Sequence, residues 1–268
     1  MTVTPPTASH YFQRIGPDRF CPTSLVGGAW REDEQHVSPL AGLITHAIET
    51  HRAQRQATPM ALSRISFDIL GQIRLEEFDL SVETTRPGRT IELVEATVTI
   101  GGRAVVRARA WFMAEADTSS VVGGQPDRMP TPETLESWSM DSVWPARGFI
   151  STLETRTVGT PQPGRTSAWM STGTELVADE PVSPLASFVA LVDTANGIAV
   201  RQEPTKWMFP NLDLTIHLHR RPEGSWTGLD TGVVFGISGI GLTSTVLHDQ
   251  RGPVGRAEQT LTVRPVEH

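Results

Sequence analysis

Residues 182–197, with the sequence VSPLASFVALVDTANG, decide how this chain folds. Ser183 favours the position just before a helix, Pro184 suits the first turn, and the closing Asn-Gly pair favours a left-handed exit. Between these marks the stretch is apolar except for Asp193 near its end. A carboxylate among apolar neighbours needs polar partners or a shifted pKa. We therefore predict an apolar helix with one candidate functional group, Asp193.

The composition is typical of a globular protein with a sizeable core. Of 268 residues, 38% are hydrophobic and 20% are charged, with a formal net charge of -7. Lys and Arg are scattered without a basic cluster, which argues against a nucleic acid or an anionic membrane as partner. Cys21 is the single cysteine, so no internal disulfide framework is expected. Without a signal-peptide pattern or a bilayer-spanning run, the expected location is the cytoplasm.

The pentapeptide VSPLA occurs twice, at residues 37–41 and again at residues 182–186. Self-similarity at a fixed offset indicates a duplicated architecture. Runs rich in β-branched and aromatic residues follow each copy, and two more precede the second copy. Gly and Pro turns separate many of them, which predicts antiparallel strands. The expected strands span residues 61–73, 78–86, 90–100 and 103–113 in the first half, and 152–157, 165–171, 211–219, 226–234, 239–247 and 254–263 in the second.

These patterns predict an α+β fold made of two helix-plus-antiparallel-sheet units. The first unit is expected over residues 10–115 and the second over residues 133–268. Residues 116–132, with Gly and Pro among polar residues, are expected to be the linker. In this interpretation the N-terminal unit is a non-catalytic copy, and the C-terminal unit carries the site.

The two halves differ in their polar residues. The pentapeptides are 145 positions apart (182 minus 37), and the glycines before the last strands, Gly102 and Gly252, are 150 apart (252 minus 102). At these offsets the second half has Asp193, Asn211 and Gln259 where the first half has Ile48, Ala61 and Arg109. One carboxylate and two amides can hold and activate a water molecule without a covalent intermediate.

Several motifs resemble the double hot-dog thioesterases related to acyl-CoA thioesterase II. They are FPNLDLTIHLHR at 209–220, PEGSWTGLD at 222–230, DTANG at 193–197, RGPVGRAEQ at 251–259, and GAW followed by QHVSP at 28–30 and 35–39. The resemblance implies one continuous sheet around two central helices. It also implies hydrolysis of an acyl-CoA thioester, without a cofactor or a metal. Because one chain supplies both units, this is compatible with a homodimer without requiring one.

In that family an Asp on the second helix, a Thr or Ser before the following strand, and a Gln on the last strand bind the hydrolytic water. The resemblance therefore implies that Asp193 and Gln259 are catalytic, whereas Asn211 stands at the hydroxyl position. Asn can still hydrogen-bond to water. We also expect Gly28, His36 and Asp213 to contact the substrate.

Other residues leave alternatives open. Four aromatic residues, Trp144, Trp169, Trp207 and Phe188, are candidates for the acyl pocket. The Asn211 departure is compatible with a hot-dog protein that binds an acyl group or a small ligand without turnover. A hot-dog dehydratase or hydratase is a further alternative, with His36, His46 and Glu49 as its candidate groups. His217 and His219 alternate on a strand but lack a third metal ligand in sequence reach.

Overall fold

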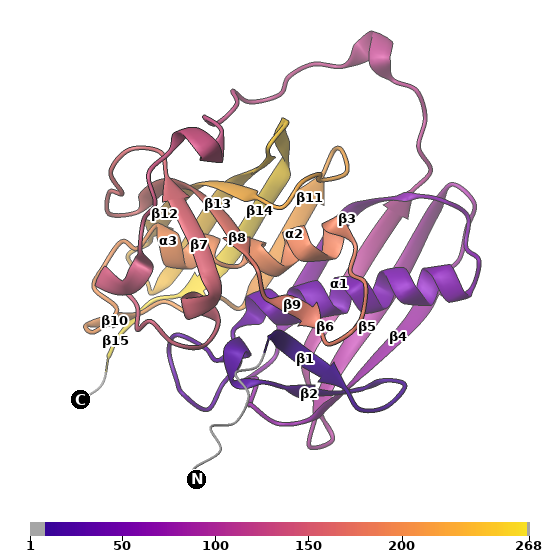
Figure 1. Ribbon diagram of the computed structural model, residues 1–268, viewed down its shortest axis with the longest axis horizontal. Helices are drawn as coiled ribbons and strands as arrows, with labels where there is room; N and C mark the ends of the chain where they lie inside the picture. Colours follow the sequence, from indigo (N-terminus) through magenta and orange to yellow (C-terminus); the bar gives the residue numbers. More distant parts are fainter. Residues whose placement is uncertain (1–8, 267–268) are drawn as a thin grey trace.

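Two helices lie side by side against one long, curved sheet (Figure 1). This computed structural model describes residues 9–266; residues 267 and 268, which end the predicted C-terminal unit, lie outside them. The N-terminal half contains β1 (His10–Arg14), β2 (Arg19–Pro22), η1 (Ser24–Val26), α1 (Val37–Gln54), β3 (Ala61–Ile69), β4 (Phe78–Arg86), β5 (Ile91–Ile100) and β6 (Arg103–Met113).

The second half repeats this order after an extended segment that contains η2 (Ser119–Val121). Its elements are η3 (Pro132–Thr134), η4 (Met140–Ser142), η5 (Gly148–Thr152), β7 (Leu153–Thr157), β8 (Arg165–Thr172), β9 (Glu175–Val177), α2 (Pro184–Val192), α3 (Ala195–Ile198), β10 (Trp207–Met208), β11 (Asp213–Leu218), β12 (Thr227–Phe235), β13 (Ile240–Asp249), β14 (Gly252–Thr262) and β15 (Arg264–Pro265).

A single sheet runs through both halves in the order β7-β8-β12-β13-β14-β11-β3-β6-β5-β4-β2-β1-β9. The halves join where β11 pairs antiparallel with β3. The sheet is mixed because β9, from the second half, pairs in parallel with β1 at the far edge. The predicted α+β double hot-dog fold, with one continuous sheet around two central helices, is confirmed.

The register of the central strands relates the two halves by an approximate twofold axis. Ser66 of β3 pairs with Thr215 of β11. On the outer sides, Ser66 pairs with Arg109 of β6 and Thr215 pairs with Glu258 of β14. Equivalent strand residues are therefore 149 positions apart (215 minus 66, and 258 minus 109).

This register corrects the predicted alignment of the strands. Arg109 corresponds to Glu258 and faces outward, where it pairs with Glu95. Gln259, which is buried, corresponds instead to the buried Ala110. A one-residue slip turns every side chain to the other face of a sheet, so an offset of 150 was wrong for these strands. At 149, Leu62 rather than Ala61 corresponds to Asn211.

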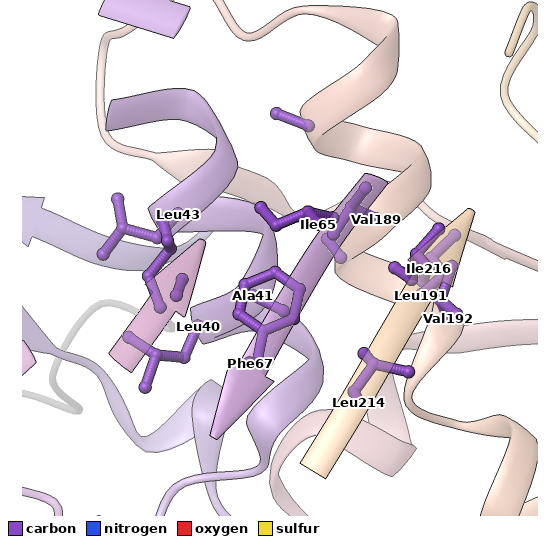
Figure 2. Close-up of a cluster of buried hydrophobic side chains, with 14 of the residues drawn as sticks. Leu40, Ala41, Leu43, Ile65, Phe67, Val189, Leu191, Val192, Leu214 and Ile216 are labelled. Carbon is purple, nitrogen blue, oxygen red and sulfur yellow. The ribbon is translucent and has the colours of Figure 1, made fainter. Parts of the chain in front are cut away.

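The core forms between the helix pair and the central strands. Leu40 and Leu43 of α1, Val189 and Val192 of α2, and Phe67 and Leu214 of the central strands are buried members of one hydrophobic cluster (Figure 2). At the contact between the helices, a Cβ built on Gly42 would lie 2.5 Å from the Ala190 Cβ. Glycine and alanine thus allow the two backbones to approach closely.

The helix around which the sequence is organised is shorter than predicted. Ser183 caps it as expected, because its Oγ accepts a hydrogen bond from the Ala186 N–H at 3.0 Å. The helix ends at Val192, and Asp193 has right-handed helical angles as its C-cap. A separate turn, α3, follows. The predicted left-handed exit at Asn196 and Gly197 was wrong, because long-range bonds hold this segment: Asn196 donates to the Phe209 carbonyl at 2.9 Å.

Within residues 9–266, none of the helices combines the length and the apolar character needed to cross a bilayer.

Gly42→Ala tests the helix contact. The added Cβ would press on Ala190 and on the Ala186 carbonyl oxygen, 3.0 Å away. Overpacking of this kind costs about 1–3 kcal/mol, against a gain in helix propensity of about 1 kcal/mol. We expect a net loss in the free energy of unfolding, measured by urea denaturation. Gly71→Ala, where a Cβ meets nothing within 4 Å, is the control. Equal stability of Gly42→Ala and wild type would contradict the contact.

Candidate active site

Asp193, Asn211 and Gln259 come together at the end of α2. Asp193 is 5% exposed, and its Oδ1 accepts one hydrogen bond from Asn211 Nδ2 and one from Gln259 Nε2, both at 2.8 Å. Gln259 lies on β14, whereas Asn211 lies just before β11 in an isolated bridge with Leu261. The three residues predicted from the sequence thus form one hydrogen-bonded group.

The second carboxylate oxygen of Asp193 has a different neighbour. Its Oδ2 lies 3.7 Å from Nδ1 of His36, the N-cap of α1. That Nδ1 accepts a hydrogen bond from the Ser38 N–H at 3.1 Å, so the ring proton belongs on Nε2. Burial lowers the pKa of His36 to about 4, so its ring is neutral at pH 7.

The environment of Asp193 favours its protonated form. Burial raises the pKa of Asp193 to about 6, and the hydrogen bonds from Asn211 and Gln259 oppose this shift only in part. The carboxyl therefore titrates close to neutral pH while its orientation is fixed by two amides. Such a group can take a proton from water at pH 7 and return it later.

A cavity of about 410 Å³ lies in front of this group, between the two halves. Asp193, Asn211 and His36 line it, with Val37 at the start of α1. Its walls include two tryptophans from different halves, Trp30 and Trp144, whose rings meet edge-on with centroids 4.9 Å apart. Gln259 is 1% exposed and lies behind Asp193 rather than in the cavity wall.

The cavity also accounts for Gly28. Its N–H is already used, because it donates to the Glu34 carbonyl at 2.8 Å. A Cβ on Gly28 would lie 2.8 Å from Glu34 Cγ, so the glycine allows the loop before α1 to close on itself beside the cavity. The Gly28 N–H is therefore not available as a donor to the substrate, and the expected role of Gly28 is reduced to forming this tight loop in the cavity wall.

Several expected residues lie elsewhere. Asp213 does not line the cavity; its Oδ1 accepts from the Thr260 N–H on the neighbouring strand at 2.7 Å. Among the aromatic candidates only Trp144 lines the cavity. Trp169 is buried with its Nε1 donating to the Pro130 carbonyl at 2.8 Å, and Trp207 is 37% exposed on β10. Phe188 is buried in the core instead.

The groups considered for other chemistries are also separated. His46 contacts Glu180 at 3.1 Å, whereas Glu49 accepts from Ser183 Oγ at 2.5 Å. His217 is exposed on β11. Among the described residues, no three His, Cys, Asp or Glu side chains gather in a way that could hold a metal ion.

Sequence reasoning missed the residues that complete the cavity walls. Trp30 lies within a motif, and nothing else in the sequence selects it as a cavity residue. The strand predicted over residues 61–73 ends at Ile69. In the structure this segment contributes Gly71, Gln72 and Ile73 to the cavity. A signal was present in Gly71, since a glycine inside a strand pattern indicates a break.

The fold, two tandem hot-dog units with a polar group at the end of the second helix, makes this chain a double hot-dog protein. Residues 27–113 match the acyl-CoA thioesterase N-terminal domain family, and residues 126–263 match the acyl-CoA thioesterase C-terminal domain family. The chain therefore belongs to the acyl-CoA thioesterase family, whose members are hydrolases. A search of curated proteins gives no match.

Solved structures share the fold over nearly the whole chain. A hot-dog protein of unknown function from Alicyclobacillus acidocaldarius is 15% identical, with a TM-score of 0.71 over 95% of this chain and 96% of that one. Acyl-CoA thioesterase II TesB2 from Mycobacterium marinum is 17% identical, with a TM-score of 0.64 over 96% and 95%. The tesB protein of Mycobacterium avium subspecies paratuberculosis is 20% identical, with a TM-score of 0.63 over 95% and 96%.

Asp193→Asn should stabilise the protein at neutral and alkaline pH. The pKa of Asp193 is about 6 in the folded state and about 3.9 for an unfolded Asp, so folding stability is lost as pH rises between these values. This two-unit difference corresponds to about 3 kcal/mol, whereas a neutral Asn carries no such penalty.

The measurement is urea denaturation of wild type and Asp193→Asn at pH 4 and pH 8. We expect the variant's advantage in the free energy of unfolding to be about 2.5 kcal/mol larger at pH 8 than at pH 4, because an unfolded Asp is already partly ionised at pH 4. The same difference at both pH values would show that charge burial is not the cause.

Proposed function

We propose that this protein hydrolyses acyl-CoA thioesters with a water molecule activated by Asp193. One observation supports this most directly: two amides fix Oδ1 of a buried carboxylate that lines a cavity, while Oδ2 receives neither amide bond. The proposed site belongs to the C-terminal unit, 133–268, and His36 and Gly28 of the N-terminal unit, 10–115, border it across the helix pair.

In the proposed reaction, Oδ2 of Asp193 takes a proton from water as the water oxygen attacks the thioester carbonyl carbon. The carbon–sulfur bond then breaks, and the protonated Asp193 returns the proton to the leaving thiolate. The products are a carboxylic acid and free coenzyme A. The step needs no redox partner.

We assign different roles to the two amides. Gln259 donates to Asp193 from behind the cavity, so it is a positioning residue. Asn211 also donates to Asp193, but it lines the cavity, where its Oδ1 can accept a hydrogen bond from the attacking water. This differs from the sequence-based expectation that all three side chains hold the water.

The first turn of α1 is the proposed stabiliser of the oxyanion. His36 and Val37 bring the N-terminus of this 18-residue helix to the cavity wall. The positive end of a helix dipole and an uncommitted N–H stabilise negative charge that develops during attack on a carbonyl. In this turn the Ser38 N–H already donates to His36 and Pro39 has none, which leaves the N–H of Val37 for this role.

The test of this proposal is thiol release from a series of acyl-CoA esters. Loss of a general base lowers rates by about 10²–10⁴-fold, so Asp193→Asn should have at most about a hundredth of the wild-type kcat/KM. Gln259→Ala should lose about tenfold, the effect of one hydrogen bond to a charged group. Asp213→Asn makes the same chemical change outside the cavity and should remain close to wild type.

Equal rates for wild type, Asp193→Asn and Gln259→Ala would contradict the assigned site. Thermal stabilisation by acyl-CoA without thiol release would instead support a protein that binds the acyl group without turnover.

The pH dependence gives a separate prediction. Because Asp193 acts in its ionised form, kcat/KM should rise with pH through about 6 in wild type. The hydrogen bond from Asn211 lowers the pKa of Asp193. Asn211→Leu, which reproduces Leu62 of the other half, should therefore move this midpoint to higher pH as well as lower the rate. An unchanged midpoint would show that the titrating group is not Asp193.

One observation favours a second candidate function, the addition or removal of water at an acyl-CoA double bond. Nδ1 of His36 and Oδ2 of Asp193 lie 3.7 Å apart, and a His with a carboxylate can share proton transfer. Incubation with an enoyl-CoA, followed by the loss of enoyl absorbance, tests this. No change in absorbance alongside thiol release from saturated acyl-CoA would exclude it.

A further inference from the structure

A second cavity of about 470 Å³ lies at the opposite end of the helix pair. Its walls come from the last turns of α1, the first turn of α2, the start of β3, the end of β6 and the loop after β11. It contains none of the residues that line the cavity at Asp193. The proposed hydrolysis therefore leaves this cavity without a role.

The approximate twofold axis relates this second cavity to the first. At the strand offset of 149, Leu62 corresponds to Asn211, and Arg221 corresponds to Gln72. Leu62 and Arg221 line the second cavity, whereas Asn211 and Gln72 line the cavity at Asp193. The two cavities are thus equivalent sites of the duplicated fold, and this equivalence suggests related ligands.

The second cavity also retains a carboxyl group opposite a helix cap. Glu49 Oε2 accepts a hydrogen bond at 2.5 Å from the Oγ of Ser183, the N-cap of α2. This repeats the arrangement in which Asp193 faces His36, the N-cap of α1. Glu49 follows Ile48, the residue that matches Asp193. Burial raises the pKa of Glu49, and two carboxyl groups that share a site can hold one proton between them.

The remaining walls have the chemistry of an amphipathic ligand site. Met60, Leu62, Phe112 and Leu185 give it an apolar side. Arg52 and Arg221 line its polar side. Their principal acidic partners are Glu92 for Arg52, at 2.7 Å, and Glu115 for Arg221, at 2.7 Å, and neither partner lines the cavity. The remaining acidic wall residue, Glu223, is paired with Arg251 at 3.0 Å.

We propose that this second cavity binds an aliphatic carboxylic acid, with the carboxyl group at Glu49, Ser183 and Arg221 and the chain against the apolar wall. It binds without hydrolysis, because Leu62 and Ala110 stand where the site at Asp193 has Asn211 and Gln259. The carboxylic acid is the class of product that thioester hydrolysis releases. Binding here does not depend on activity at Asp193, so the two proposals can fail separately.

Equilibrium dialysis with radiolabelled decanoate tests this on the full chain. The informative variant is Ala53→Trp, which places an indole in the cavity from an exposed position of α1. The control is Gln54→Trp, the next residue on the same helix, which is exposed and does not line the cavity. Circular dichroism confirms that both variants are folded.

We expect Ala53→Trp to bind one decanoate fewer per chain than wild type and Gln54→Trp. This loss of one site is the criterion whether or not the cavity at Asp193 also binds decanoate. Equal binding by all three proteins would overturn the proposal. Thiol release measured on the same proteins reports on Asp193 alone.

Recognition of the carboxyl group has its own test. Ala53→Trp identifies the decanoate that binds in the second cavity. Arg221→Ala should weaken the binding of this decanoate by about tenfold, the effect of losing a charged hydrogen-bond partner. Decan-1-ol, which has the same chain without the carboxyl group, should bind there at least as weakly. Equal affinity for decanol and decanoate, or an unchanged affinity in Arg221→Ala, would overturn the assignment of a carboxylic acid.

Discussion

The close contact between α1 and α2 is the constraint on which the rest of this structure depends. Gly42 against Ala190 lets two buried helices pack with their backbones near one another, and the sheet wraps around the pair. Because the helices run in opposite directions, the end of each one lies beside the beginning of the other. Asp193 thus meets the cap of α1, and Glu49 meets the cap of α2. Both cavities are direct consequences of this packing.

The duplicated fold separates the requirements of folding from those of chemistry. Ile48 and Asp193 occupy matching helix positions, yet only the first contributes apolar burial to the core. Keeping Asp193 ionised among buried neighbours costs stability, and the amides of Asn211 and Gln259 offset part of that cost. The N-terminal half, with Leu62 and Ala110 at the amide positions, carries no such cost. This explains how one copy can supply packing while the other supplies polar groups.

Much of the architecture could be predicted because its signals are local. The repeated VSPLA pentapeptide indicated the duplication, and Asp193 stood out as a charge in an apolar helix. The exact strand register could not be predicted, because the segments between helices and strands differ in length and change the offset between the halves from 145 at the pentapeptides to 149 at the strands. Nor could the cavity walls, since the contact between Trp30 and Trp144 joins residues more than a hundred positions apart.

The pairing of β9 with β1 has a consequence for how the chain is synthesised. The N-terminal half is made first, but one of its edge strands receives its hydrogen-bonding partner from residues 175–177. Its other edge, β3, waits for β11, which is made later still. An unpaired strand edge is a template for association with other chains. On the ribosome, the nascent first half therefore presents two open edges until β9 has emerged and one until β11 has emerged, and during that time each open edge can associate with another chain.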